Sequence, residues 1–391
     1  MNRYLPFILT CFFVYCSSSA ISYLTFSSMK PNPSTGQEPT PAKTAVATDA
    51  PAINEIPEGT EECPLNGRMY SKEYKNKWDK RRPLGIMIEN SVDARPQSGL
   101  SSADVIYEAV AEGGITRFLT LFYCLDSQTV GPVRSARMYF LDTLRGYGES
   151  PLYGHVGGAN TPGPADALGM IRRLGWQNYN DMDQFAIGML AYRRDYDRLP
   201  NVATEHTMYT NTEKLWSFAK TKRKLTEVNE EGARWDKLFK KWKFADGKPS
   251  KEKTTNSIAV PFWTNVSYAG DYLVNWKYDI TSNTYLRFHA SKPHLDKNTD
   301  KQIAPKNVVI MFAQESVAKD GYEGGQHLLY DIIGTGDALV FQNGKAIKAT
   351  WVKEDSDTLA RFTDASTQKE IEFVRGQTFV QIVPTGNKVT Y

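Results

Sequence analysis

Residues that could recognise an anion are concentrated in the range Arg81–Arg145, next to the ends of predicted strands. Asn90 follows the apolar run Leu84–Ile88, and Arg134 and Arg137 lie at the start of a predicted helix. Two arginines three positions apart on a helix present their planar guanidinium groups to one side, where each can hold an oxyanion through paired hydrogen bonds. Polar residues at strand ends are typical of binding sites in α/β sheets. This stretch therefore predicts an anion-binding site.

A second set of candidates is associated with the predicted strand Pro151–Val156. This strand leads into a glycine-rich loop and then into the predicted helix Pro164–Leu174. A strand, a glycine-rich loop and a helix in this order present free backbone N–H groups to an anion. The loop matches no nucleotide-binding motif, so a tight turn without a ligand is the alternative. The predicted binding face comprises Asn90, Arg134, Arg137, His155, Gly157, Gly158, Arg194 and His206.

No complete catalytic motif is present, since the chain lacks GxSxG, HExxH and CxxC. Ser135 could act as a nucleophile with His155 or His206. The carboxylates that could form the acid pair of a glycosidase are Glu89, Asp104 and Glu112. Alternatively, these carboxylates form ion pairs with arginines, of which the candidates are Arg95, Arg117, Arg134 and Arg137. Catalytic residues therefore stay unassigned.

No metal or cofactor is predicted. His289, His294 and Asp296 are the one combination considered as metal ligands, but neither helical spacing nor a third close ligand supports it. Loop residues near a strand end are the preferred interpretation.

Two of the four cysteines could form a disulfide bond. Cys11 and Cys16 lie in the apolar leader, which leaves Cys63 and Cys124 for an oxidising exterior. A bridge between them would close a loop of about 60 residues. The alternative is a buried free thiol at Cys124.

The order of strands and helices in residues 63–225 predicts an α/β (or α+β) domain. Residues 257–391 contain mainly strand signals and two hairpin turns, Ser282-Asn283 and Asn343-Gly344, which predict a mostly antiparallel β domain.

Between these domains, residues 226–256 are rich in lysine, arginine and tryptophan. The apolar residues Trp235, Leu238, Phe239 and Trp242 fall at i, i+3, i+4 and i+7, which predicts a basic amphipathic helix that packs on a domain. Alternating basic and aromatic residues can also bind nucleic acid or anionic polymers. The helix is preferred, because the apolar spacing is typical of a core and an exported protein rarely meets nucleic acid.

Residues 1–26 have the layout of an export signal, with Arg3 before an apolar run and a small-residue cleavage motif at Ser18-x-Ala20. Apolar residues continue over Ile21–Phe26, so an uncleaved anchor that spans the membrane is the preferred alternative. Acylation is not expected, because a tyrosine precedes Cys16. Residues 27–62 are rich in proline and threonine and predict a disordered tether. The globular part is therefore expected at the cell membrane, outside the cytoplasm.

Several motifs resemble the YerB family of bacterial lipoproteins. They include ARPQSGL, GPVRSAR, ADVIYEA, EGGITRF and EHTMYTN, and the likeness covers about residues 63–391. The resemblance implies an extracytoplasmic protein of two parts. It implies no catalytic residues, because none are defined for the family.

The formal net charge of +3 is close to neutral, so overall charge favours no class of partner. The sequence predicts a membrane-tethered envelope protein without catalytic activity, which binds an anionic cell-wall component or an envelope protein rather than nucleic acid. The alternative is a cell-envelope hydrolase that acts on peptidoglycan or a related glycan.

Overall fold

The computed structural model describes residues 59–251, 255–322 and 326–391. The predicted anchor over residues 1–26, and the predicted tether up to residue 58, lie outside the described residues. Within the described ranges, no helix has the length and apolar character needed to cross a membrane.

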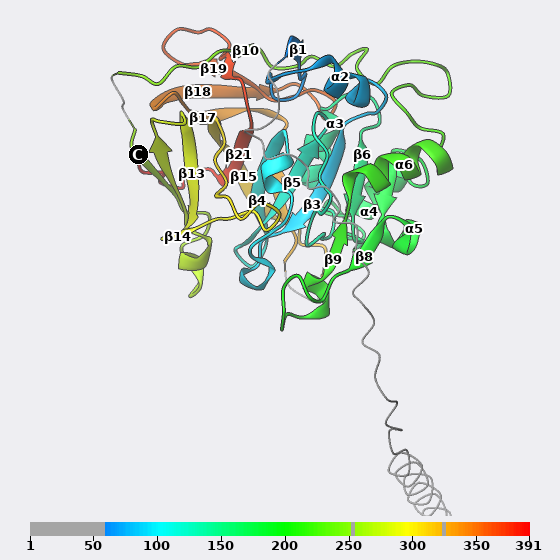
Figure 1. Cartoon of the computed structure of the whole chain (residues 1–391). Coiled ribbons are helices and arrows are strands. Elements are labelled where there is room, and N and C mark those ends of the chain that lie inside the picture. Colours follow the sequence, from blue (N-terminus) through cyan, green and yellow to red (C-terminus); the bar gives the residue numbers. More distant parts are fainter. Residues whose placement is uncertain (1–58, 252–254, 323–325) are drawn as a thin grey trace, which may run out of the picture. The chain divides into compact units, whose positions relative to one another are not determined.

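One sheet of eleven strands runs through both halves of the chain, in the order β19-β18-β17-β15-β21-β4-β5-β3-β6-β7, with β16 paired to β15. Its N-terminal strands are β3 (Leu84–Glu89), β4 (Val105–Glu112), β5 (Ile115–Phe122), β6 (Leu152–His155) and β7 (Asp181–Asp183). Its C-terminal strands are β15 (Asn307–Val317), β16 (Leu328–Asp331), β17 (Gly334–Gln342), β18 (Lys345–Lys353), β19 (Arg361–Asp364) and β21 (Thr378–Pro384). Strand β21 pairs in parallel with both β15 and β4, so it joins the two halves (Figure 1).

The central strands are apolar along most of their length because both faces of the sheet are covered. In β4 and β5 nearly every residue is buried, which is the pattern of strands with no solvent-facing side. Gly113 and Gly114, both with positive φ, form the tight connection between these two strands.

Short helices flank the N-terminal half of the sheet. They are α2 (Lys72–Trp78), α3 (Met138–Arg145), α4 (Ala167–Arg173), α5 (Gln184–Ile187) and α6 (Thr212–Lys222), and α4 to α6 lie together at one side of the molecule (Figure 1). The side chain of Asp166 accepts a hydrogen bond from the N–H of Gly169 at the start of α4, and Asn211 caps α6 in the same way. The predicted α/β class of this half is confirmed.

The C-terminal half is mostly antiparallel, as predicted. Besides its strands in the main sheet, it forms a four-stranded antiparallel sheet of β11 (Ser257–Val260), β12 (Val274–Asp279), β13 (Thr284–His289) and β14 (Lys292–Pro293). Asn283, Asn343 and Gly344 have positive φ at the two predicted hairpin turns. Three small pairings complete the fold: β1 (Glu61–Glu62) with β2 (Met69–Tyr70), β8 (Tyr192–Arg194) with β9 (Met208–Thr210), and β10 (Phe244–Ala245) with β20 (Phe373–Val374).

The predicted amphipathic helix in residues 226–256 is wrong. The described residues of this segment contain the short strand β10 and no helix. Trp235 and Trp242 are buried, but Leu238 is 87% exposed, so these residues do not share one face. The backbone bonds to distant segments instead: the carbonyl of Trp235 accepts from Glu149 and that of Lys243 from Phe373. Tertiary hydrogen bonds thus replace the helical ones, and the tryptophans anchor an extended segment.

A disulfide bond joins Cys63 to Cys124, whose Cα atoms are 6.1 Å apart, and both residues are buried. It attaches the beginning of the fold to the end of the central strand β5. Asp104 lies beside it and accepts hydrogen bonds from the N–H groups of Tyr123 (2.7 Å) and Cys124 (3.0 Å). Burial raises the pKa of Asp104 to about 7. In the described part of the chain, these two cysteines and Asp104 form the one cluster with metal-ligand spacing, but its sulfurs are bonded to each other.

Reduction of the disulfide should lower the free energy of unfolding by up to about 4 kcal/mol, because the bond restricts a loop of about 60 residues in the unfolded chain. Urea unfolding with and without dithiothreitol measures the change. The variant Cys63→Ser/Cys124→Ser serves as control, because reductant should not affect it. Two free thiols in the denatured, unreduced protein would contradict the bond.

Candidate functional site

Polar residues gather at one edge of the sheet, at the carboxyl ends of the parallel strands β3, β6 and β7. These strands pair in parallel and end at Glu89, His155 and Asp183. The segment after Gly131 lies against them, because the N–H of Arg134 bonds to the carbonyl of Met87 and the carbonyl of Arg134 accepts from Val156. The ends of parallel strands are where α/β sheets place their sites.

Glu89 is the centre of the first cluster at this edge. Its carboxylate lies 3.2 Å from Arg134 Nε, as an ion pair without hydrogen-bond geometry, and accepts a hydrogen bond of 2.8 Å from His206 Nδ1. Arg134 also pairs with the exposed Glu205, 3.3 Å away. Arg194 donates to the carbonyl of Thr204 and so braces the turn that carries His206. Arg134 and His206 are thus brought together around a carboxylate of the protein itself, and Arg194 supports the turn of His206.

His155 forms the second cluster and is fully buried. Its Nε2 is 2.7 Å from Asp181 Oδ1, and its Nδ1 is 2.8 Å from the carbonyl oxygen of Gly157. Because both partners are acceptors, the ring satisfies them only when both nitrogens carry protons. Burial acts to lower the pKa of His155, but the hydrogen bond and charge of Asp181 outweigh it and raise the pKa. His155 was predicted to lie on a binding face, but in the structure its imidazole is enclosed.

The glycine-rich loop is shaped by packing. Gly157 has φ of +55°, and its N–H donates to Asp183. A Cβ at Gly158 would lie 2.9 Å from the side chain of Leu168 in α4. The N–H of Gly157 is therefore used within the protein, and Gly158 is required by its close packing on α4.

Arg137 lies apart from Arg134, which corrects the prediction that both share a helical turn. Helix α3 begins at Met138, so Arg134 precedes it and Arg137 is its N-cap. Arg137 forms an ion pair with Glu112, and Arg117 donates to the same carboxylate at 3.1 Å. The two arginines predicted to bind one anion instead neutralise two different carboxylates, which is the alternative that the sequence left open.

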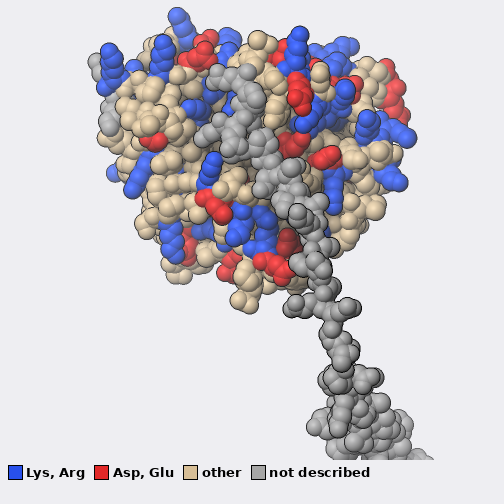
Figure 2. Space-filling model, viewed as in Figure 1, with Lys and Arg blue, Asp and Glu red and all other residues tan. Residues whose placement is uncertain are grey.

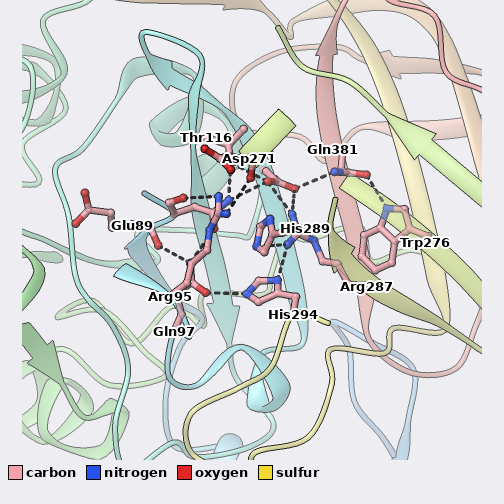
Figure 3. A network of polar contacts seen from close by, with 12 residues as sticks. Glu89, Arg95, Gln97, Thr116, Asp271, Trp276, Arg287, His289, His294 and Gln381 are labelled. Atoms are coloured by element: carbon pink, nitrogen blue, oxygen red, sulfur yellow. Dashed lines mark hydrogen bonds and ion pairs between the residues drawn. The ribbon is translucent and has the colours of Figure 1, made fainter. Parts of the chain in front are cut away.

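Asn90 belongs to a buried network that joins the two halves of the chain (Figure 3). At its centre Arg287 of β13 donates two hydrogen bonds, 2.9 and 2.8 Å long, to Glu108 of β4. Both side chains have no exposed surface. Glu108 also accepts from Asn90, Thr116 and Gln381, and Gln381 accepts from the indole N–H of Trp276. A buried ion pair with this many partners ties β4, β13 and β21 together.

His289 and His294 pack on each other, with ring centroids 4.4 Å apart, and both contact the NH1 atom of Arg287 (Figure 3). Burial and the positive charge of Arg287 lower the pKa of both histidines well below the ordinary value. The third residue of the considered metal set, Asp296, accepts from the N–H groups of Gly99 and Ser101. One nitrogen of each histidine is therefore used by the guanidinium of Arg287, and the carboxylate of Asp296 is used elsewhere.

The sequence contained a signal for this network that the prediction did not use. Glu108 interrupts the apolar strand VIYEAVAE, and Arg287 interrupts the strand TYLRFH. A single charge inside an apolar strand requires a buried partner. The sequence does not say that these two residues are partners, because they are 179 positions apart.

Replacement of Arg287 by Met should lower the free energy of unfolding by about 3–5 kcal/mol, because Glu108 would remain buried without its partner. Equilibrium denaturation measures this loss. Arg234→Met is the matched control: Arg234 pairs with Asp236 at the surface, so its loss should cost less than about 1 kcal/mol. The double variant Glu108→Gln/Arg287→Met should be more stable than the sum of its single changes predicts. Equal losses for Arg287→Met and Arg234→Met would contradict the role of the pair.

The buried histidines predict a loss of stability in weak acid. In the unfolded chain, His289 and His294 bind protons below about pH 6.5. In the folded protein both histidines stay neutral to lower pH, because their pKa values are lowered. The free energy of unfolding should therefore fall between about pH 7 and 5, by up to about 1.4 kcal/mol per pH unit for each histidine. His155, with its raised pKa, acts in the opposite direction. His294→Gln should make the fall shallower, and an unchanged pH profile in this variant would contradict the assignment.

Comparisons with known proteins cover both halves of the fold. Residues 70–226 match the family model "Protein of unknown function (DUF3048) N-terminal domain", and residues 264–380 match "Protein of unknown function (DUF3048) C-terminal domain". The protein "Putative lipoprotein YerB" of Bacillus subtilis (strain 168) is 32% identical over 306 residues, which are 78% of this chain and 82% of YerB.

The crystal structure of the YerB protein from Bacillus subtilis has a similar fold. It superposes with a TM-score of 0.65 at 28% identity, and the match covers 85% of this chain and 100% of that chain. The motifs that resemble the YerB family therefore lie on a shared fold. The chain belongs to the YerB-like DUF3048 family.

Proposed function

We propose that this protein is an extracytoplasmic binding module of the cell envelope, whose ligand is an anionic wall component or an envelope protein. The name of its relative describes a lipoprotein, a class that an acyl chain holds at a membrane. For this chain we propose the same location, with attachment through the N-terminal segment. A buried disulfide supports an oxidising compartment.

The observation that supports a binding role over catalysis is that the polar groups at the sheet edge are paired with one another. Glu89 is paired with Arg134 and accepts a hydrogen bond from His206, Glu112 is paired with Arg117 and Arg137, and His155 is enclosed by its two acceptors. A glycosidase needs one carboxyl group that is free to donate a proton and a second that faces the sugar. Paired and buried groups of this kind favour a rigid scaffold over an acid–base catalyst.

One contact favours the alternative, a hydrolase. The hydrogen bond between Glu89 and His206 Nδ1 orients the imidazole as a carboxylate orients a general base. Ser135, the nucleophile considered from the sequence, uses its carbonyl oxygen to accept from Arg117, which fixes its backbone near the same edge.

The two functions are distinguished by incubating the full-length protein, purified in detergent, with insoluble cell-wall material. We expect the protein to sediment with the wall and to release no soluble sugar or peptide fragments. His206→Ala should sediment as well as the unaltered protein. Release of fragments that disappears in His206→Ala would establish the hydrolase instead. Failure to sediment with any wall preparation would contradict a wall ligand.

A further inference from the structure

A groove of about 740 Å³ lies where the two halves of the chain meet. Its walls come from the segment before β2, from β13 and the loop that follows β14, and from the loop between β20 and β21. The groove shares no residue with the polar edge. Of its residues, Ser282 was predicted to lie in a hairpin turn, and none was predicted to bind a ligand.

The charged residues that line the groove are mainly cations. They are Arg68, Lys301, Lys306 and Arg375, against the single carboxylate of Asp246. On the face shown in Figure 2, positive and negative residues are interspersed. With a net charge of +3 for the whole chain, a local excess of cations in a concave surface is the feature that can attract an anion.

Among the described residues, no carboxylate forms an ion pair with Lys306. Its half-buried side chain donates to the carbonyl oxygen of Ser282 at 2.7 Å, and no carboxylate is among the groups that act on it. Burial and then the charge of Arg68 lower the pKa of this ammonium group. Both Arg68 and Lys306 line the same groove, and a bound anion would stabilise two cations on one concave surface.

The backbone next to Lys306 is adapted to hold it there. Gly376 has φ of +132°, and a Cβ at this position would lie 2.5 Å from Lys306 Cγ. The lysine stem therefore lies directly on the glycine, and its ammonium group is directed by packing as well as by Ser282. Any larger residue at position 376 would displace the stem.

Arg375 is held in place next to this position by two carboxylates and a backbone carbonyl. Its Nε lies 3.1 Å from the exposed Asp246, and its NH1 donates to the carbonyl oxygen of Gly67 at 2.6 Å and pairs with Glu62. These contacts join the beginning and the end of the fold, so the groove has a defined shape before a ligand binds.

We propose that this groove binds a polymer that carries phosphate groups. A phosphate presents oxygens in several directions and can be approached by Arg68 and Lys306 together, whereas a carboxylate offers two coplanar oxygens. The groove is much larger than one oxyanion, and its cations come from separate segments, so successive phosphates of one chain can occupy it. This inference rests on the proposed binding function and assigns it a site and a ligand class.

The test is a calorimetric titration of the full-length protein with short linear polyphosphate at low salt. Poly-glutamate is the carboxylate polymer for comparison. Lys306→Met keeps the stem on Gly376 and removes the charge, so binding of polyphosphate should weaken by about tenfold or more. Lys348→Met, at an exposed position of β18 outside the groove, is the matched control and should bind as the unaltered protein does.

The second measurement is the pKa of Lys306, determined by NMR of its ε carbon. It should rise when polyphosphate is added and remain unchanged with poly-glutamate. Equal binding by Lys306→Met and Lys348→Met, or tighter binding of poly-glutamate, would overturn the assignment. If Lys306→Met still sediments fully with wall material, the groove is not the wall-binding site, although the proposed envelope function would stand.

Discussion

The ion pair between Glu108 and Arg287 is the constraint on which the arrangement of this protein depends. Two charges without exposed surface are tolerated only when each meets a full set of partners, because desolvation of an unpaired charge costs several kcal/mol. Glu108 belongs to the main sheet and Arg287 to the four-stranded sheet, while Gln381 on β21 contacts the same carboxylate. Any displacement of one sheet relative to the other would break this set, so the pair specifies how the halves are joined.

The same principle explains the polar edge of the sheet. Glu89, Glu112 and His155 are buried or partly buried at strand ends, and each is matched by charge or hydrogen bond within the chain. The arginines that suggested an anion-binding site recognise anions, as expected for guanidinium groups. Those anions are carboxylates of the protein itself. The cluster therefore holds in place the loops that follow β3, β6 and β7 and the turn that carries His206.

Strand β21 has a structural effect that extends to the groove. Because it inserts between β15 and β4, the loop that precedes it is placed beside the first residues of the fold, where Arg375 meets Glu62 and Gly67. The cations of the groove thus come from near both ends of the described chain and from the segment between β14 and β15. Their proximity is a consequence of topology, and it is stabilised by the disulfide that holds Cys63 against β5.

The sequence by itself determined the local elements of this protein, and the tertiary structure decided which side chains meet. Apolar strands such as Leu84–Glu89, the asparagine turns at 283 and 343 and the stop of α4 at Gly175 follow from local sterics and periodicity. The 226–256 segment was mispredicted, because Trp235 and Trp242 are buried by distant partners and not by a helical face. Arg134 and Arg137 look alike in sequence but pair with different carboxylates, and Glu108 meets a residue 179 positions away. Such pairings depend on strand order, which local propensity does not encode.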